Sequence, residues 1–235
     1  MPIREDIEPV ERYLFLLLFA PDSTGKFSQP IRGNTRLQKE MFVLSKLDTQ
    51  LAEDAEFDAY AMGAYSDTVA EIQDEFCISG FAEQSPEGAL ALTLDGRKEA
   101  ERVWNNTTDA ERKKVGMVKA WLNDLTFNEL LAIVYTEYPE SASKSEVKEQ
   151  VDARRPDLAI SLLRKGKANF DLAQRVAGLT SSQFEDLLAV RGISKSLLET
   201  TQVLLDSSLL EDIEKSRYDA RNRRLVPWER MKPEP

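Results

Sequence analysis

Residues 81–96 read FAEQSPEGALALTLDG, and this stretch decides the fold of the chain. Its two short runs, 81–84 and 89–93, predict two strands. Between them, Ser85-Pro86-Glu87-Gly88 is a group of turn-forming residues, which predicts a four-residue hairpin loop. A helix is predicted to follow over 97–104. The stretch therefore predicts a β-hairpin that leads directly into a helix.

Three helices are predicted before this hairpin. The apolar residues of segment 8–19 recur at helical spacing. A second helix begins at Asn34 or Thr35, either of which can cap it. Ser66 is predicted to cap the third helix, and Gly80 to end it. Three helices, a hairpin and a further helix are the order of a winged helix-turn-helix domain.

The segment between the second and third helices predicts a short strand over 57–62 and a turn at Gly63-Ala64-Tyr65. This turn is expected to aim the third helix, which is the element that reads DNA in a winged helix. The exposed residues expected on that helix are mostly acidic and form a poor surface for a DNA groove: Asp67, Glu71, Gln73, Asp74 and Glu75. We therefore expect the first domain to bind protein.

The second half of the chain is predicted to consist mainly of short helices separated by polar breaks and turns. Short helices over 171–177 and 181–191 flank the turn Gly178-Leu179-Thr180, which is typical of a helix-turn-helix. Gly178 permits the left-handed backbone that closes the turn, and Thr180 can cap the second helix. A further helix is expected over 194–212.

These elements predict a mainly α protein with a small β-hairpin wing, a C-terminal helix-turn-helix domain and an arm. The expected units are a winged-helix domain over 1–106, a helical connector over 107–155, a helix-turn-helix domain over 156–213 and an extended Arg-rich tail over 214–235.

Composition excludes most catalytic chemistry. The 235 residues include one cysteine, Cys77, and no histidine. A Ser-His-Asp triad, a Cys-His pair and a His-ligated zinc site are therefore all impossible. Carboxylate-held Mg²⁺ stays chemically open, so a metal-dependent nuclease is the enzyme alternative. We expect a protein that is not an enzyme and holds no cofactor and no metal.

The net charge of −10 sets the conditions for binding. An acidic molecule repels phosphate backbones, so DNA binding requires a local basic patch. The chain lacks an apolar run of about 18 residues, and its N-terminus lacks the pattern of a signal peptide. We expect a cytoplasmic protein without membrane contact.

About residues 13–146 resemble a known group of proteins through three motifs. These are Arg32-Gly33-Asn34-Thr35-Arg36-Leu37-Gln38-Lys39, Gly63-Ala64-Tyr65-Ser66 and Leu92-Thr93-Leu94-Asp95-Gly96. They are similar to the YwgA-like proteins of prokaryotes and to Panacea-type antitoxin domains. Ala64 stands where the pattern of that group has proline.

About residues 158–193 resemble a small family of antitoxin-like helix-turn-helix proteins. The resemblance lies in Leu163-Arg164-Lys165-Gly166-Lys167, in the segment 173–180 and in Arg191-Gly192-Ile193. Both resemblances imply regulation or toxin–antitoxin biology, and neither implies an enzyme.

Two sets of residues are predicted to contact other macromolecules. The set expected to bind DNA combines a basic patch with the start of the helix after the turn: Arg164, Lys165, Lys167, Arg175, Ser181, Ser182 and Gln183. The set expected to bind a protein partner is Arg32, Arg36, Lys39, Arg217, Arg221, Arg223, Arg224 and Trp228. The alternatives are ordinary solvated charges, a helix-turn-helix used only for packing, and a tail without a role.

The leading hypothesis is a regulatory protein of antitoxin type that binds a protein partner and, through its helix-turn-helix units, DNA. A homodimer would help DNA binding, because one such module buries little DNA surface. The alternative is a scaffold or accessory subunit of a larger complex with no nucleic-acid role.

Overall fold

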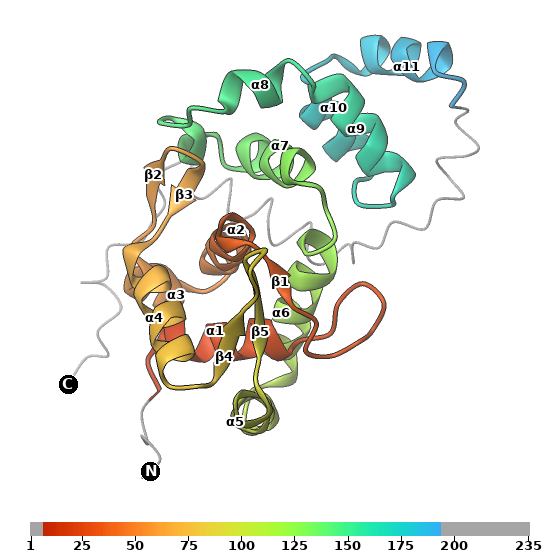
Figure 1. Ribbon diagram of the computed structural model, residues 1–235. Helices are drawn as coiled ribbons and strands as arrows, with labels where there is room; N and C mark the ends of the chain where they lie inside the picture. The colour runs from red at the N-terminus through yellow and green to blue at the C-terminus, as the bar shows by residue number, and fades with distance from the viewer. Residues whose placement is uncertain (1–6, 194–235) are drawn as a thin grey trace, which may run out of the picture.

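The computed structural model describes residues 7–193, which form a mainly helical molecule with two small antiparallel sheets (Figure 1). The mainly α class predicted from the sequence is confirmed. The helix predicted over 194–212 and the tail predicted over 214–235 lie outside the described residues. So do five residues predicted to bind a partner: Arg217, Arg221, Arg223, Arg224 and Trp228.

Helix α1 (Pro9–Phe19) is the centre of the core. Every side chain from Tyr13 to Leu18 is buried, so this helix is apolar on all sides. Such a helix is stable only when other elements surround it. It packs against α3 (Thr49–Ala55), α5 (Leu94–Asn105) and α6 (Asp109–Leu122).

The predicted hairpin is present as β4 (Ala82–Gln84) and β5 (Ala89–Leu92), which pair antiparallel. A third strand, β1 (Ile31–Arg32), pairs with β5 and brings Ile31 opposite Leu90. This strand was not predicted, because two residues are too few to show an alternating pattern.

The second sheet is a hairpin of β2 (Asp58–Tyr60) and β3 (Gly63–Tyr65). The prediction of a turn at residues 63–65 was wrong, because the turn is formed by Ala61 and Met62. Gly63 has a positive φ of 86°, and a Cβ there would lie 2.7 Å from the Tyr135 ring. Glycine therefore allows β3 to lie directly against α7 (Phe127–Glu137).

Helix α2 (Asn34–Ser45) begins where it was expected, but the predicted cap was wrong. Gly33, with φ of 88°, occupies the cap position and supplies no side-chain bond. The Asn34 side chain instead accepts hydrogen bonds from the amides of Gln73 and Gln84, at 3.2 and 3.0 Å. It thereby joins α2 to α4 (Asp67–Ile78) and to β4.

Helix α5 begins at Leu94, three residues before the predicted start. The Thr93 hydroxyl accepts the Gly96 N–H at 3.0 Å and caps the helix. A Cβ on Gly96 would lie 1.7 Å from the Phe81 carbonyl oxygen. The Leu-Thr-x-x-Gly motif is thus explained by a helix cap followed by a close approach of two backbones.

After α6, the described residues up to 193 form five further helices and a 3₁₀ turn, which make up the upper part of Figure 1. They are α7, the turn η1 (Pro139–Ala142), α8 (Lys148–Asp152), α9 (Arg155–Arg164), α10 (Phe170–Ala177) and α11 (Ser181–Val190). Helices α10 and α11 lie on either side of the predicted turn. Gly178 has a φ of 70°, and the Thr180 hydroxyl accepts the Gln183 N–H.

One apolar core runs through the described residues, from Val10 in α1 to Ile193. It includes Trp121 in α6 and Leu131 in α7, both within the predicted connector. Helix α6 packs on α1 and α2, and α7 packs on α2 and α9. The segment 107–155 is therefore part of the core.

Candidate macromolecule-binding surfaces

Two of the three basic residues in the first predicted partner-binding cluster, Arg32, Arg36 and Lys39, are buried. Arg36 is 8% exposed and donates to the carbonyl oxygens of Leu122 and Leu125, each at 2.5 Å. Lys39 is 1% exposed and donates to the Ala64 carbonyl oxygen at 2.6 Å. The prediction that these side chains lie on the surface was wrong, and only Arg32 of the three is exposed.

The whole Arg36–Glu40 segment of α2 is directed inward. Gln38 forms two hydrogen bonds with the Ser66 backbone, accepting its N–H at 2.9 Å and donating to its carbonyl at 3.0 Å. Together with Lys39 it fixes the backbone between β3 and α4. In the motif 32–39, which carries part of the first resemblance, Arg36, Gln38 and Lys39 therefore form structural contacts.

Glu40 is the most deeply buried charged group of this segment, with no exposed surface. Burial raises its pKa to about 8, although Lys119 and Arg36 act in the opposite direction. Lys119 is also buried and donates to the Leu18 carbonyl at 2.9 Å. Burial lowers its pKa to about 8, against the effect of Glu40. This acid and base therefore face each other in the interior between α2 and α6.

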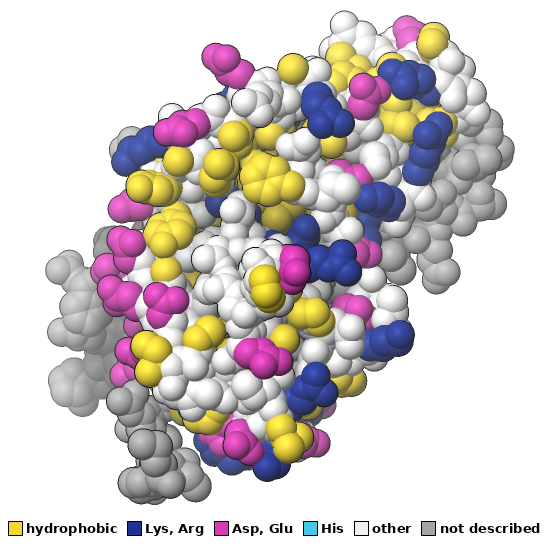
Figure 2. All heavy atoms as spheres, viewed as in Figure 1, with side chains coloured by type: hydrophobic (Ala, Val, Ile, Leu, Met, Phe, Trp, Pro, Cys, Tyr) yellow, Lys and Arg dark blue, Asp and Glu magenta, His cyan; other side chains and the backbone are white. Residues whose placement is uncertain are grey.

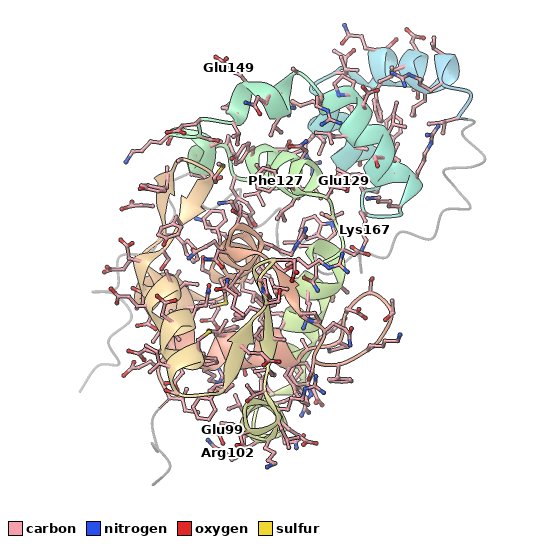
Figure 3. The ribbon with its side chains drawn as sticks, in the orientation of Figure 1. Glu99, Arg102, Phe127, Glu129, Glu149 and Lys167 are labelled. Carbon is pink, nitrogen blue, oxygen red and sulfur yellow. The ribbon has the colours of Figure 1, made fainter. Side chains whose placement is uncertain are left out.

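Lys167, one of the residues predicted to bind DNA, is buried. This residue is 2% exposed; its Nζ donates to the Ala120 carbonyl at 2.5 Å and pairs with Asp124 at 2.7 Å. Its own carbonyl accepts the indole N–H of Trp121 at 2.9 Å. The turn between α9 and α10 is thereby fastened to the end of α6 (Figure 3).

Two further residues of the patch are paired with buried carboxylates. Lys165 pairs with Glu129 at 2.7 Å, and Arg175 pairs with Glu137 at 3.1 Å; both carboxylate side chains are 2% exposed. Ion pairs with such partners hold these cations against α7. Arg164 is exposed and takes part in none of the ion pairs formed among residues 7–193.

The polar residues at the start of α11 are exposed, but two of them are bonded locally. The Gln183 side chain accepts the Thr180 N–H and hydroxyl, each at 3.0 Å. The Ser181 hydroxyl bonds to the Gln174 side chain at 3.1 Å. Ser182 is exposed as well. The helix therefore offers few groups that are ready to read bases.

The buried cations share a structural role that the sequence did not reveal. Arg36 and Lys167 bind carbonyls at the C-terminal end of α6, and Lys119 binds one at the end of α1. Arg155 binds the carbonyls of residues 175 and 176 at the end of α10. Cations at helix C-termini satisfy free carbonyls and oppose the negative end of the helix dipole.

An exposed aromatic pair lies on the β2–β3 hairpin. Tyr60 is 62% exposed, and its ring centroid lies 5.5 Å from that of Tyr65. Met62, in the connecting turn, is 39% exposed. Sequence reasoning missed this site, and the signal available was a Tyr-Ala-Met-Gly-Ala-Tyr segment with a glycine that permits a tight hairpin.

The charges are divided very unequally along the chain. Residues 47–96 contain twelve Asp and Glu residues and no Lys or Arg. They include β2, β3 and α4, and Figure 2 shows carboxylates gathered along the side of the molecule formed by these elements. We call this side, defined by Asp58, Asp67, Glu71, Asp74 and Glu75, the acidic face. All five residues are exposed.

An open groove of about 430 Å³ lies between the loop after α1 and helices α5 and α6. It is lined in part by Pro21, Trp104, Arg112 and Met117. Arg112 is engaged by the Trp104 carbonyl at 3.1 Å and by Asp109. Because Asp22 and Asp109 also line the groove, its charges are mixed and select no ligand class.

Within residues 7–193, no cluster of acidic and cysteine side chains has the arrangement of a metal site. No helix in that range combines the length and apolarity needed to cross a membrane. Comparison with protein-family models, with curated proteins and with solved structures finds no match to this chain.

Proposed function

We propose that this chain is a non-catalytic regulatory protein of antitoxin type that acts by binding a protein partner through its acidic face and the adjoining β2–β3 hairpin. The observation that carries the proposal is the placement of the basic residues. Lys167 is buried, and Lys165 and Arg175 are paired with buried carboxylates. Within the described residues of the predicted DNA-binding patch, this leaves Arg164 as the unpaired cation available to a phosphate backbone.

The exposed residues favour a protein as the partner. Tyr and Met are enriched at protein interfaces, and Tyr often dominates their binding energy. Tyr60 and Met62 offer this chemistry on the hairpin. The regulatory, antitoxin-type part of the proposal, and the assignment of the first domain as a winged helix, rest on the motif resemblances and on the order of the elements.

A specific observation supports DNA as a second candidate. Helices α10 and α11 are joined by a turn with the left-handed Gly178 and the Thr180 cap, as in a helix-turn-helix. Arg164 and Ser182 are exposed near or on these helices. Against it stand Glu185 and Asp186, which are exposed on α11 and repel phosphate.

The test is co-purification of the full chain from its own host after mild crosslinking. We expect a stoichiometric partner with the wild type and with the control variant Leu94→Ala, whose side chain is 73% exposed on α5. The double variant Tyr60→Ala/Met62→Ala is expected to lose it, because a central aromatic contact contributes about 2 kcal/mol or more.

The same purified chain is then titrated with labelled DNA from its own upstream region at low salt and at about 0.15 M salt. Saturable binding that survives the higher salt and falls on Arg164→Ala would favour the DNA candidate. A partner that is retained by the double variant would contradict the proposed surface.

A further inference from the structure

Tyr60 and Tyr65 occupy positions on the same face of the β2–β3 hairpin. Residues two apart in a strand point to the same side, so Asp58 and Tyr60 of β2 share a face. The register places Asp58 directly opposite Tyr65 of β3 and Tyr60 opposite Gly63. Tyr60 is exposed and Tyr65 is half-buried, so the pair presents one open ring, and Asp58 stands opposite the other.

Helix α4 brings further carboxylates to the same tyrosines. Asp67 and Asp74 are seven residues apart, about two helical turns, so they lie on one side of the helix. Burial raises the pKa of Tyr65, and the negative charges of Asp67 and Asp74 raise it further. Helix α4 therefore adds to the negative charge around the tyrosine pair, where Asp58 stands directly opposite Tyr65 in the register.

These carboxylates form no ion pair within the described part of the chain. None of the ion pairs formed among residues 7–193 involves Asp58, Asp67 or Asp74. The segment 139–146, which includes the exposed Lys144, lies against the hairpin, where the Glu146 N–H donates to the Ala61 carbonyl at 2.9 Å. The acidic face thus has carboxylates that are without an ion pair among the described residues.

We propose that the Tyr60–Tyr65 pair and the bordering carboxylates bind an arginine side chain from a basic segment of the protein partner. A guanidinium is planar and stacks on an aromatic ring, while its N–H groups donate to carboxylates in the fork geometry. Tyr60 supplies the ring, and Asp58 and Asp74 supply the acceptors. The inference rests on the proposed function, since it names the chemistry of that partner.

The negative charge of the acidic face favours a basic protein segment over nucleic acid or lipid as the bound partner. The acidic face repels nucleic acid and anionic lipid, whereas it attracts a basic protein segment over long range. Lysine satisfies the charge but lacks the planar group, so it gains less from the tyrosine pair. The site should therefore prefer arginine to lysine at equal charge.

The experiment uses the full chain and two labelled peptides of alternating sequence, Arg-Gly and Lys-Gly, matched in length and charge. Fluorescence anisotropy is measured at low salt and at about 0.15 M salt. We expect the Arg peptide to bind severalfold more tightly than the Lys peptide. Tyr60→Ala should weaken the Arg peptide about two- to fivefold, the contribution of one exposed cation–π contact, and remove the preference.

The matched controls separate this site from general attraction. Asp74→Asn should weaken both peptides, whereas Glu83→Gln removes an exposed charge of the same sign on β4 and should have a smaller effect. Leu94→Ala should bind as the wild type does. Equal binding of both peptides, unaffected by Tyr60→Ala, would show only diffuse attraction and overturn the proposal.

A variant with the arginines of segment 217–230 changed to glutamine tests whether the chain supplies its own occupant. Because the loss of five positive charges raises the attraction for both cationic peptides, the readout is the ratio of their two affinities. An unchanged ratio supports a partner in trans, whereas a rise confined to the Arg peptide shows that this segment competes for the site and overturns the assignment of the site to a partner. The two proposals fail separately. A hairpin-dependent partner without arginine preference refutes only this inference, while arginine preference without any co-purified partner refutes only the proposed function.

Discussion

Replacing Glu129 by Gln should destabilise the protein strongly at neutral pH and much less in acid. This carboxylate accepts the Thr126 N–H at 2.7 Å and the Thr126 hydroxyl at 2.9 Å within the capping box of α7. It also accepts the Ser161 hydroxyl at 2.6 Å and pairs with Lys165 at 2.7 Å, both from the α9 side. One side chain therefore caps α7 and joins it to α9 (Figure 3).

The expected loss of unfolding free energy in Glu129→Gln follows from the pKa of Glu129. Burial alone would raise it, but the hydrogen bonds from Lys165, Ser161 and Thr126 outweigh burial and lower the pKa from 4.5 to about 2. A depressed folded-state pKa stabilises the fold above the unfolded value of 4.5, and the stabilisation is lost as the pH falls towards 2. A shift of this size corresponds to about 3 kcal/mol at pH 7.

The assay is urea unfolding followed by circular dichroism at several pH values between 7 and 3, with wild type and Glu129→Gln measured side by side. The difference in unfolding free energy should be about 3 kcal/mol at pH 7 and should shrink steadily below pH 4.5. The control is Glu99→Gln, whose pair with Arg102 lies on α5 with both side chains partly exposed. That change should cost less than about 1 kcal/mol. A difference for Glu129→Gln that stays constant across this pH range would refute the reasoning.

Three further predictions concern stability and use the same unfolding assay. Gly96→Ala should destabilise by about 3 kcal/mol or more, because its Cβ would overlap the Phe81 carbonyl oxygen, whereas Gly116→Ala on α6, whose Cβ would make ordinary contact with the Pro21 ring at 3.8 Å, should stabilise by up to about 1 kcal/mol; equal effects would contradict this. The unfolding free energy of Glu40→Gln should rise relative to that of the wild type as the pH increases from 5 to 8. The folded-state pKa of Glu40 is raised to about 8, so the wild type loses stability between pH 4.5 and 8, whereas glutamine does not titrate. A difference in unfolding free energy that does not change with pH would be inconsistent with this prediction. Lys167→Met should cost about 2 kcal/mol, the contribution of a charge-assisted hydrogen bond, and an unchanged midpoint would show that this ammonium has no structural role.

Local chemistry allowed most of the helix starts and the β4–β5 hairpin to be predicted from the sequence. Ser66, Thr126 and Thr180 each cap a helix by accepting the N–H three residues later. Gly178 closes a turn within its own short segment. These interactions span four residues or fewer, so the neighbouring sequence contains both partners.

The tertiary structure alone decided which basic residues are exposed. Arg36 binds carbonyls 86 and 89 residues away, and the bond from Lys167 to Ala120 spans 47 residues. A charged side chain is buried only when distant elements supply its acceptors, because the cost of removing it from water must be offset. The candidate site on the hairpin was missed for a related reason. Tyr60 and Tyr65 meet only because the strands pair in one register, and their ring contact depends on that pairing.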